Sequence, residues 1–215
     1  MTFMDIAIAE SGTPEWYEAR IFAQDSYRRT YGATTAPSPD RFVTVRESPR
    51  GAIVACAGLS GPGTDGFFSE NYLGCPVERA LAPVAGDVPE RGEVVEVGPL
   101  AGAGGAGGEL IRLMPVIAWC QGKRFILATV TDRVEEAMAR AGVPFVPLRQ
   151  ASADWMDEEA RSGWGSYYER SPTTGVVPLD SIGRLINSLT GRYTFVELAV
   201  QTLVGTSREV SGAHA

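Results

Sequence analysis

The order of hydrophobic and polar positions predicts alternating helices and strands along most of the chain. Residues 14–31 carry apolar side chains at helical spacing, and Thr13 followed by Pro14 is typical of a capped helix start. Residues 41–47 alternate in the manner of a half-buried strand, and an apolar run follows over residues 51–59 after a turn. These two strands are predicted to form an antiparallel hairpin.

The same patterns continue beyond the hairpin. Residues 67–82 indicate a helical or mixed segment that is broken at Gly74 and Pro76. Further elements are predicted as a strand over 93–101, a helix over 110–118, a strand over 124–130, a short helix over 133–141 that ends at Gly142, and strands over 143–148 and 164–169. Two amphipathic stretches follow after Pro172.

This order of elements predicts a mixed α/β (α+β) fold, in which helices flank a partly antiparallel central sheet. We expect one main domain over residues 1–175 and a small helical C-terminal extension over residues 176–215. Apolar side chains between residues 179 and 204 must pack against something, either the chain's own sheet or a second subunit. The expectation is a homodimer.

Composition restricts the class of protein. A 215-residue chain with 44% hydrophobic and 21% charged residues is typical of a folded globular protein. No stretch is apolar enough to span a membrane, and the N-terminus does not have the pattern of a secretory signal, so a cytoplasmic location is expected. Three scattered cysteines and a single histidine, His214, argue against disulfides, a metal site and a Ser-His-Asp triad.

The net charge of −7 argues against a nucleic-acid partner, since that affinity depends on Lys and Arg neutralising phosphates. An aminoacyl-tRNA substrate is therefore less expected than a small one. The basic residues do concentrate in the first fifty positions, which is also how a solvated helix face would look.

A glycine-rich segment between the strand at 93–101 and the helix at 110–118 is the best-marked functional feature. Five of its seven residues, from Gly102 to Gly108, are glycine and the other two are alanine. A strand, a glycine-rich turn and a helix start together bind phosphate through backbone N–H groups. A ligand-free surface loop is the alternative.

Two phosphate chemistries compete for this segment. Gly102, Gly104 and Gly107 fit the dinucleotide pattern GxGxxG, so an NAD-type binder stays open, although the antiparallel hairpin before it does not suit a Rossmann domain. No Lys-Ser/Thr pair closes the loop, which excludes a Walker A site.

The element order resembles the GNAT superfamily, whose glycine loop and following helix bind the pyrophosphate of acyl-CoA. A closer resemblance over residues 15–175 is to the thermostable hemolysin family, a GNAT-like group. It is carried by YGA at 31–33, RFVTVR at 41–46, ACAGL at 55–59, FFSENYL at 67–73, VVEVGPLA at 94–101 and WGSYYE at 164–169. At the position where GNAT loops usually have Gln or Arg, this chain has Gly102.

The GNAT resemblance implies direct acyl transfer from CoA or a phosphopantetheine carrier, with no metal. The residues expected to contact the donor are Val97, Leu100, Gly102, Gly104, Gly105, Ala106, Gly107 and Gly108. GNAT enzymes often use a strand glutamate as base and a tyrosine as acid, which would be Glu96 and either Tyr167 or Tyr168. Because those tyrosines are neighbours on a predicted strand, only one would face the cleft.

A second polar and aromatic group, Glu70, Tyr72 and Trp164, is expected to bind the acceptor, although Glu70 and Tyr72 would equally suit a helix surface. The resulting hypothesis is an acyltransferase acting from acyl-CoA or an acyl carrier protein on a small amine, hydroxylamine or amino acid. The alternatives are an aminoacyl-tRNA-dependent transferase, a non-catalytic or toxin-like interaction protein on the same fold, and an NAD-type dinucleotide binder.

Overall fold

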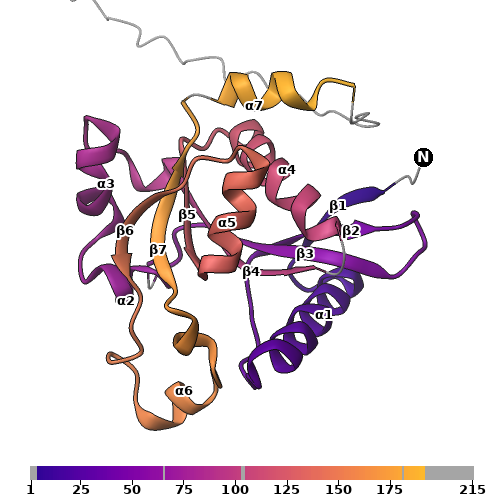
Figure 1. Cartoon of the computed structure of the whole chain (residues 1–215), viewed down its shortest axis with the longest axis horizontal. Helices are drawn as coiled ribbons and strands as arrows, with labels where there is room; N and C mark the ends of the chain where they lie inside the picture. Colours follow the sequence, from indigo (N-terminus) through magenta and orange to yellow (C-terminus); the bar gives the residue numbers. More distant parts are fainter. Residues whose placement is uncertain (1–3, 65, 103–104, 181, 192–215) are drawn as a thin grey trace, which may run out of the picture.

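The computed structural model describes residues 4–64, 66–102, 105–180 and 182–191. In this part of the chain seven strands form one sheet in the order β1-β2-β3-β4-β5-β7-β6 (Figure 1). Neighbouring strands are antiparallel except β4 and β5, which run parallel. The predicted mixed α/β class is confirmed, and a doubly wound parallel sheet for a dinucleotide is not present in the described residues.

The N-terminal half follows the sequence pattern closely. Helix α1 (Pro14–Tyr31) begins where the Thr13 hydroxyl accepts the N–H of Trp16, and it ends at Gly32, whose φ of 70° is left-handed. Strands β2 (Arg41–Arg46) and β3 (Ile53–Ser60) form the predicted hairpin. Strand β1 (Asp5–Glu10), which sequence analysis did not predict, pairs with β2 at one edge of the sheet.

The middle of the chain leads to the central strand. Helices α2 (Glu70–Leu73) and α3 (Val77–Ala85) are separated at Gly74 and Pro76, as predicted. A 3-10 turn, η1 (Arg91–Glu93), then leads into β4 (Val94–Gly102). Beyond β4 lie α4 (Ala106–Cys120), β5 (Phe125–Val130) and α5 (Asp132–Ala141), the last ending at left-handed Gly142.

A bulge in β4 separates it from β5. Gly58 of β3 lies opposite two residues of β4, Gly98 and Pro99, because the register passes from Ala57↔Leu100 to Leu59↔Val97. A Cβ at Gly58 would lie 2.4 Å from the Gly98 carbonyl oxygen, so only glycine fits there. The ladder to β5 stops at Val97↔Ala128 although β4 continues to Gly102, and the two strands therefore part after Val97.

The C-terminal part corrects one prediction. Residues 164–169 do not form a strand; Tyr167–Arg170 form the 3-10 turn η2, after helix α6 (Glu158–Ser162). The last strand is β7 (Thr173–Pro178), inserted between β5 and β6 (Val146–Gln150). The expected domain boundary after residue 175 falls inside β7.

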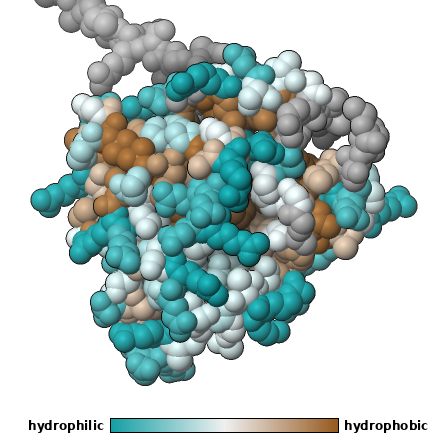
Figure 2. All heavy atoms as spheres, viewed as in Figure 1, coloured by the Kyte–Doolittle hydropathy of each residue, from teal (hydrophilic) through white to brown (hydrophobic). Residues whose placement is uncertain are grey.

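The sheet has a different helical layer on each face. Helices α4, α5 and α7 (Ile182–Leu189) pack with Val95, Ile126 and Ala128 on one face. Helix α1 covers the first strands on the other face, and α2 and α3 pack with Val94, Phe125 and Leu127 there. Figure 2 shows hydrophobic patches between hydrophilic residues on the face that it presents.

The described part of the C-terminal stretch packs on its own sheet layer. Ile182, Leu185 and Leu189 of α7 are buried in the same cluster as α4. The second amphipathic stretch, at 193–204, lies outside the described residues. The expected homodimer stays a prediction.

Candidate functional site

Glu96 lies between two core clusters on the face covered by α1 and α2. Strand alternation turns Val95 toward α4 and turns Glu96 toward the start of α2. Its Oε2 accepts the Phe68 N–H at 2.8 Å, and its Oε1 accepts the Ser69 N–H at 2.9 Å and the Ser69 hydroxyl. The carboxylate is thus buried and held by three donors.

Burial raises the pKa of Glu96, because it penalises the charged form, and the negative charge of Glu70 adds to this rise. The hydrogen bonds from Ser69 and Phe68 act in the opposite direction without cancelling it. A carboxylate with a raised pKa in a hollow of the protein is suited to accept a proton near neutral pH.

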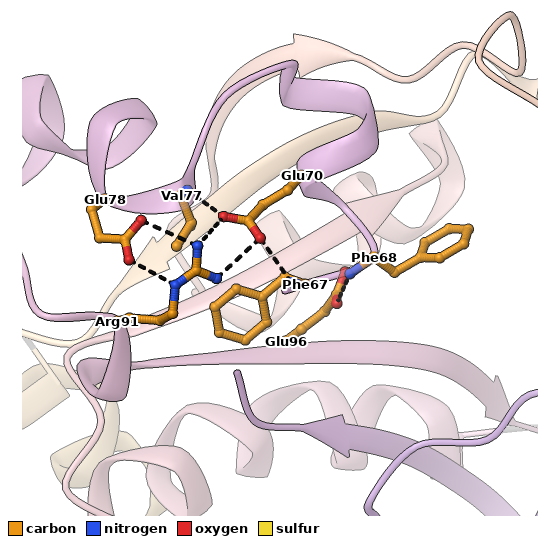
Figure 3. Close-up of polar contacts among 7 residues, drawn as sticks. All are labelled: Phe67, Phe68, Glu70, Val77, Glu78, Arg91 and Glu96. Carbon is orange, nitrogen blue, oxygen red and sulfur yellow. Dashed lines mark hydrogen bonds and ion pairs between the residues drawn. The ribbon is translucent and has the colours of Figure 1, made fainter. Parts of the chain in front are cut away.

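Glu70 reaches the same segment from another side, as Figure 3 shows. It accepts the N–H groups of Phe67 at 2.9 Å and Val77 at 2.6 Å, and it pairs with Arg91, which also binds Glu78. Burial alone would raise the pKa of Glu70, but the hydrogen bonds from Arg91 and the backbone outweigh it and lower the pKa. The predicted acceptor residue Glu70 therefore lines a separate hollow, beside Arg91.

A chain of hydroxyl groups connects Glu96 to the far side of the cleft. The Ser69 hydroxyl lies 2.9 Å from that of Thr129 on β5, which lies 2.7 Å from that of Thr174 on β7. Thr129 and Thr174 face each other across the β5–β7 ladder. This chain fixes the Ser69 hydroxyl, so the donor to Glu96 is oriented by strands on the other side of the opening.

The two candidate tyrosines have different surroundings. Tyr167 is buried, contacts Tyr27 and Tyr31 of α1, and donates its hydroxyl to the Thr129 carbonyl at 3.3 Å. Tyr168 shares a 2.7 Å hydrogen bond with Tyr72 and lies beside Met156. The expected alternation on a strand was wrong, because both residues belong to η2, but only Tyr167 lines the hollows described next.

Two hollows meet where β4 and β5 part. The first, here the apolar cavity, lies between the sheet and helices α4 and α5, with Ile111, Met114, Met138 and Val143 in its wall. The second, here the aromatic pocket, lies on the other face and contains Glu96 beside Phe68, Tyr72 and Trp164. Both are lined by Tyr27, Val97, Gly98, Thr129 and Tyr167. A molecule threaded between the strands would enter both.

The glycine segment lies at the end of β4 and the start of α4, and Leu100 also lines the apolar cavity. A Cβ at Gly102 would lie 2.7 Å from the Cα of Gly107, so these glycines let the strand end meet the helix. A Cβ at Gly105 or Gly108 would meet nothing within 4 Å. The open helix start, followed by Ala106, has room for a phosphate; Gly104 lies outside the described residues.

Sequence analysis missed several residues of the site. Ser69 lies in the FFSENYL segment of the family resemblance but had no predicted role, and Thr129 carried no motif. Tyr27 fell within the predicted helix α1 as an ordinary apolar position. Residues 35–39, between the predicted helix at 14–31 and the predicted strand at 41–47, had no predicted role and form one wall of the aromatic pocket. Backbone bonds from Thr34 and Thr35 to the Gly163 carbonyl hold that loop against the segment that carries Trp164.

The described residues contain no group of His, Cys, Asp or Glu arranged to hold a metal ion. No helix among them is long and apolar enough to cross a membrane.

A sheet whose parallel strand pair opens beside a glycine-rich helix start defines a GNAT-like fold. The sequence matches the thermostable hemolysin family over residues 9–182, and the chain belongs to this family. No protein with a curated description matches it significantly.

Solved structures of GNAT-like proteins have the same architecture. BjaI, a CoA-dependent acyl-homoserine lactone synthase solved with SAM and isopentyl-CoA, is 17% identical over 88% of this chain and 89% of its own, with a TM-score of 0.56. FeeM, an N-acyl amino acid synthase from uncultured soil microbes, is 11% identical over 83% and 92%, with a TM-score of 0.55. TofI, solved with an inhibitor and MTA, is 18% identical over 85% and 96%, with a TM-score of 0.55. At these identities the likeness concerns the fold.

Proposed function

We propose that this protein is an acyltransferase that moves an acyl group from a thioester donor, acyl-CoA or an acyl carrier protein, to a small amine. The observation that carries the proposal is the meeting of the two hollows at the opening between β4 and β5, with Glu96 on one side. A thioester in that opening would have its carbonyl carbon within reach of an amine in the aromatic pocket.

The residues supply the proton transfers that the reaction needs. The amine nitrogen attacks the thioester carbon, a C–N bond forms and the C–S bond breaks. In our proposal Glu96 takes the proton that the amine loses, and the Tyr167 hydroxyl gives a proton to the departing thiolate. Burial raises the pKa of Tyr167 far above its ordinary value, so this hydroxyl is protonated at neutral pH. The same burial makes it a weak acid, and it would release the proton only as the negative charge develops on the sulfur.

The donor would lie along the glycine segment and across the opening. The open N-terminus of α4 at Gly105 and Gly108 suits a diphosphate, which needs backbone N–H groups and a helix dipole and no basic surface. The aliphatic wall of the apolar cavity favours an acyl chain of several carbons over acetyl. The acidic net charge disfavours aminoacyl-tRNA as the donor.

Free thiol released from acetyl-, octanoyl- and dodecanoyl-CoA in the presence of a mixture of small amines tests the proposal, with the acylated product identified by mass spectrometry. The expected result is amine-dependent thiol release that is faster for the longer chains. No acylated amine with any donor, including an acylated carrier protein, would contradict it.

A further inference from the structure

The charges around the aromatic pocket discriminate between classes of acceptor. Among the described residues that line it, Glu96 is the one carboxylate, and none is Lys, Arg or His. An amino-acid acceptor would bring a second carboxylate into a hollow with no cation to pair with it. A buried unpaired carboxylate is costly, and here it would also face the charge of Glu96.

The walls of the pocket are suited to a positive charge. Phe68 and Tyr72 lie in edge contact at 5.6 Å between centroids, and Phe68 also contacts Trp164 at 5.8 Å. Trp155 does not line the pocket but contacts Phe68 from outside it, at 5.6 Å. Phe68 is 44% exposed and Trp155 43%, which is unusual for rings of this size. Exposed aromatic faces attract ammonium and guanidinium groups.

The segment that carries Trp155 and Trp164 has an excess of negative charge. Residues 151–170 contain five carboxylates, Asp154, Asp157, Glu158, Glu159 and Glu169, and two arginines, Arg161 and Arg170. Of these, Asp157 is partly used in capping α6. A cation approaching the pocket past this segment is attracted, and an anion is repelled.

From these three observations we propose that the acceptor is a small organic amine with a net positive charge and no carboxylate, such as a diamine, a guanidinoalkylamine or an arylalkylamine. This inference rests on the proposed function and narrows its acceptor. The attacking nitrogen first gives its ammonium proton to solvent and reacts as the neutral amine. The C–N bond then replaces the C–S bond, the second amine proton passes to Glu96 and the thiolate leaves with a proton from Tyr167.

Pairs of compounds that differ by one carboxylate provide the test. Agmatine against arginine, putrescine against ornithine, and tyramine against tyrosine are compared as acceptors with octanoyl-CoA. In at least one pair, the kcat/KM of the amine is expected to be at least about tenfold higher than that of the amino acid. In no pair should the amino acid have the higher kcat/KM. Equal or better use of the amino acids would overturn the inference while leaving the acyltransferase in place.

Binding without donor separates the two proposals. Calorimetry of the same compounds should show that the preferred amine binds and that its amino acid does not. Amine binding without turnover would support the inference and contradict the proposed function. Absence of binding for every amine in the set, with or without a non-hydrolysable acyl-CoA analogue, would overturn the inference.

A charge introduced at the rim of the pocket makes the test specific. Ser38 is exposed and lines the pocket, so Ser38→Lys should raise the KM of the preferred amine about tenfold, whereas Ser38→Asp should lower it. Trp155→Leu should also raise the KM of the preferred amine. Trp119→Leu, which removes an exposed tryptophan at the end of α4, is the matched control and should change nothing. Equal KM values in Ser38→Lys and Ser38→Asp would contradict the inference.

Discussion

Glu70 and Glu96 hold one short turn from two sides. Glu70 accepts the N–H of Phe67 and Glu96 accepts that of Phe68, so adjacent peptide groups are fixed by different carboxylates. The turn cannot shift without breaking one of these bonds. Arg91, which contacts Glu70 and not Glu96, therefore positions Glu96 indirectly.

This relationship predicts the effect of Arg91→Met. The substitution removes the Arg91 guanidinium, so Glu70 loses its ion-pair partner and the turn at Phe67 and Phe68 loosens. As a result, kcat should fall about tenfold or more. The uncompensated charge of Glu70 should also raise the pKa of Glu96, which moves the acidic limb of kcat/KM to higher pH. Arg91→Lys keeps a positive charge, so its kcat and the pH of its acidic limb should lie between those of Arg91→Met and the wild type.

Arg124→Met is the matched control for Arg91→Met. Arg124 also pairs with two carboxylates, Asp87 and Glu93, but none of the three lines the aromatic pocket or the apolar cavity. Its pH profile should remain that of the wild type. An unshifted profile in Arg91→Met would show that the Glu70 pair serves stability alone.

Glu96→Gln should lower acyl transfer by about 10²-fold or more with little change in donor affinity, because the proton is removed in the transition state. The amide nitrogen of the new side chain replaces one of the two accepting oxygens and cannot accept an N–H from Phe68 or Ser69, so Glu96→Asp is measured beside it as a second variant. In the wild type, kcat/KM should fall as the pH drops through the raised pKa of Glu96, because the protonated acid no longer accepts a proton. A fully active Gln variant would show that Glu96 is structural.

Gly105→Asp should abolish acyl-CoA binding and leave the fold intact. The new side chain has open space at the helix start, but its charge repels a diphosphate there. Gly183→Asp makes the same change in the first turn of α7, at an exposed glycine that also has open space, and should bind as the wild type does. Calorimetry with acyl-CoA checks both; unchanged affinity in folded Gly105→Asp would remove the phosphate site.

We expect Tyr167→Phe to lower turnover and Tyr168→Phe to lower stability. The Tyr167 hydroxyl lies between the two hollows, so its loss should lower kcat, whereas loss of the Tyr168 hydroxyl removes a hydrogen bond to Tyr72 and should cost about 1 kcal/mol of stability. Turnover and thermal unfolding of each variant separate the effects. Full turnover in Tyr167→Phe would assign the proton donor to another group.

The sequence predicted the elements whose signals are local. Thr13 and Pro14 mark the start of α1, and Gly142 marks the end of α5. It did not predict β7, because residues 173–177 form a short run between Pro172 and Pro178, and the residues that pair with them on β5 are distant in sequence. The aromatic run at 164–169 resembles a strand, but Tyr167 packs against α1 and Gly165 takes a φ of 54° against the Tyr31 carbonyl.

Part of the candidate site could also be predicted from the sequence. Glu96 was evident as a carboxylate in an apolar strand, and the glycine segment by its composition. Its partner Ser69, and Thr129 which contacts Ser69, were not, because each hydroxyl acquires its role only when the fold brings β5 beside the start of α2. Glu70 was expected to bind the acceptor beside Tyr72 and Trp164, and only the structure shows that it pairs with Arg91 and lines a different hollow.

The place of β7 in the sheet also affects how the chain is synthesised. Both β5 and β6 leave the ribosome before the strand that separates them, and each must wait with an unpaired edge until residue 178 is available. Thr174, the end of the hydroxyl chain to Glu96, arrives with that strand. A nascent chain of 170 residues would therefore lack β7, and its cleft would be unfinished beside the unpaired edge of β5, which favours aggregation.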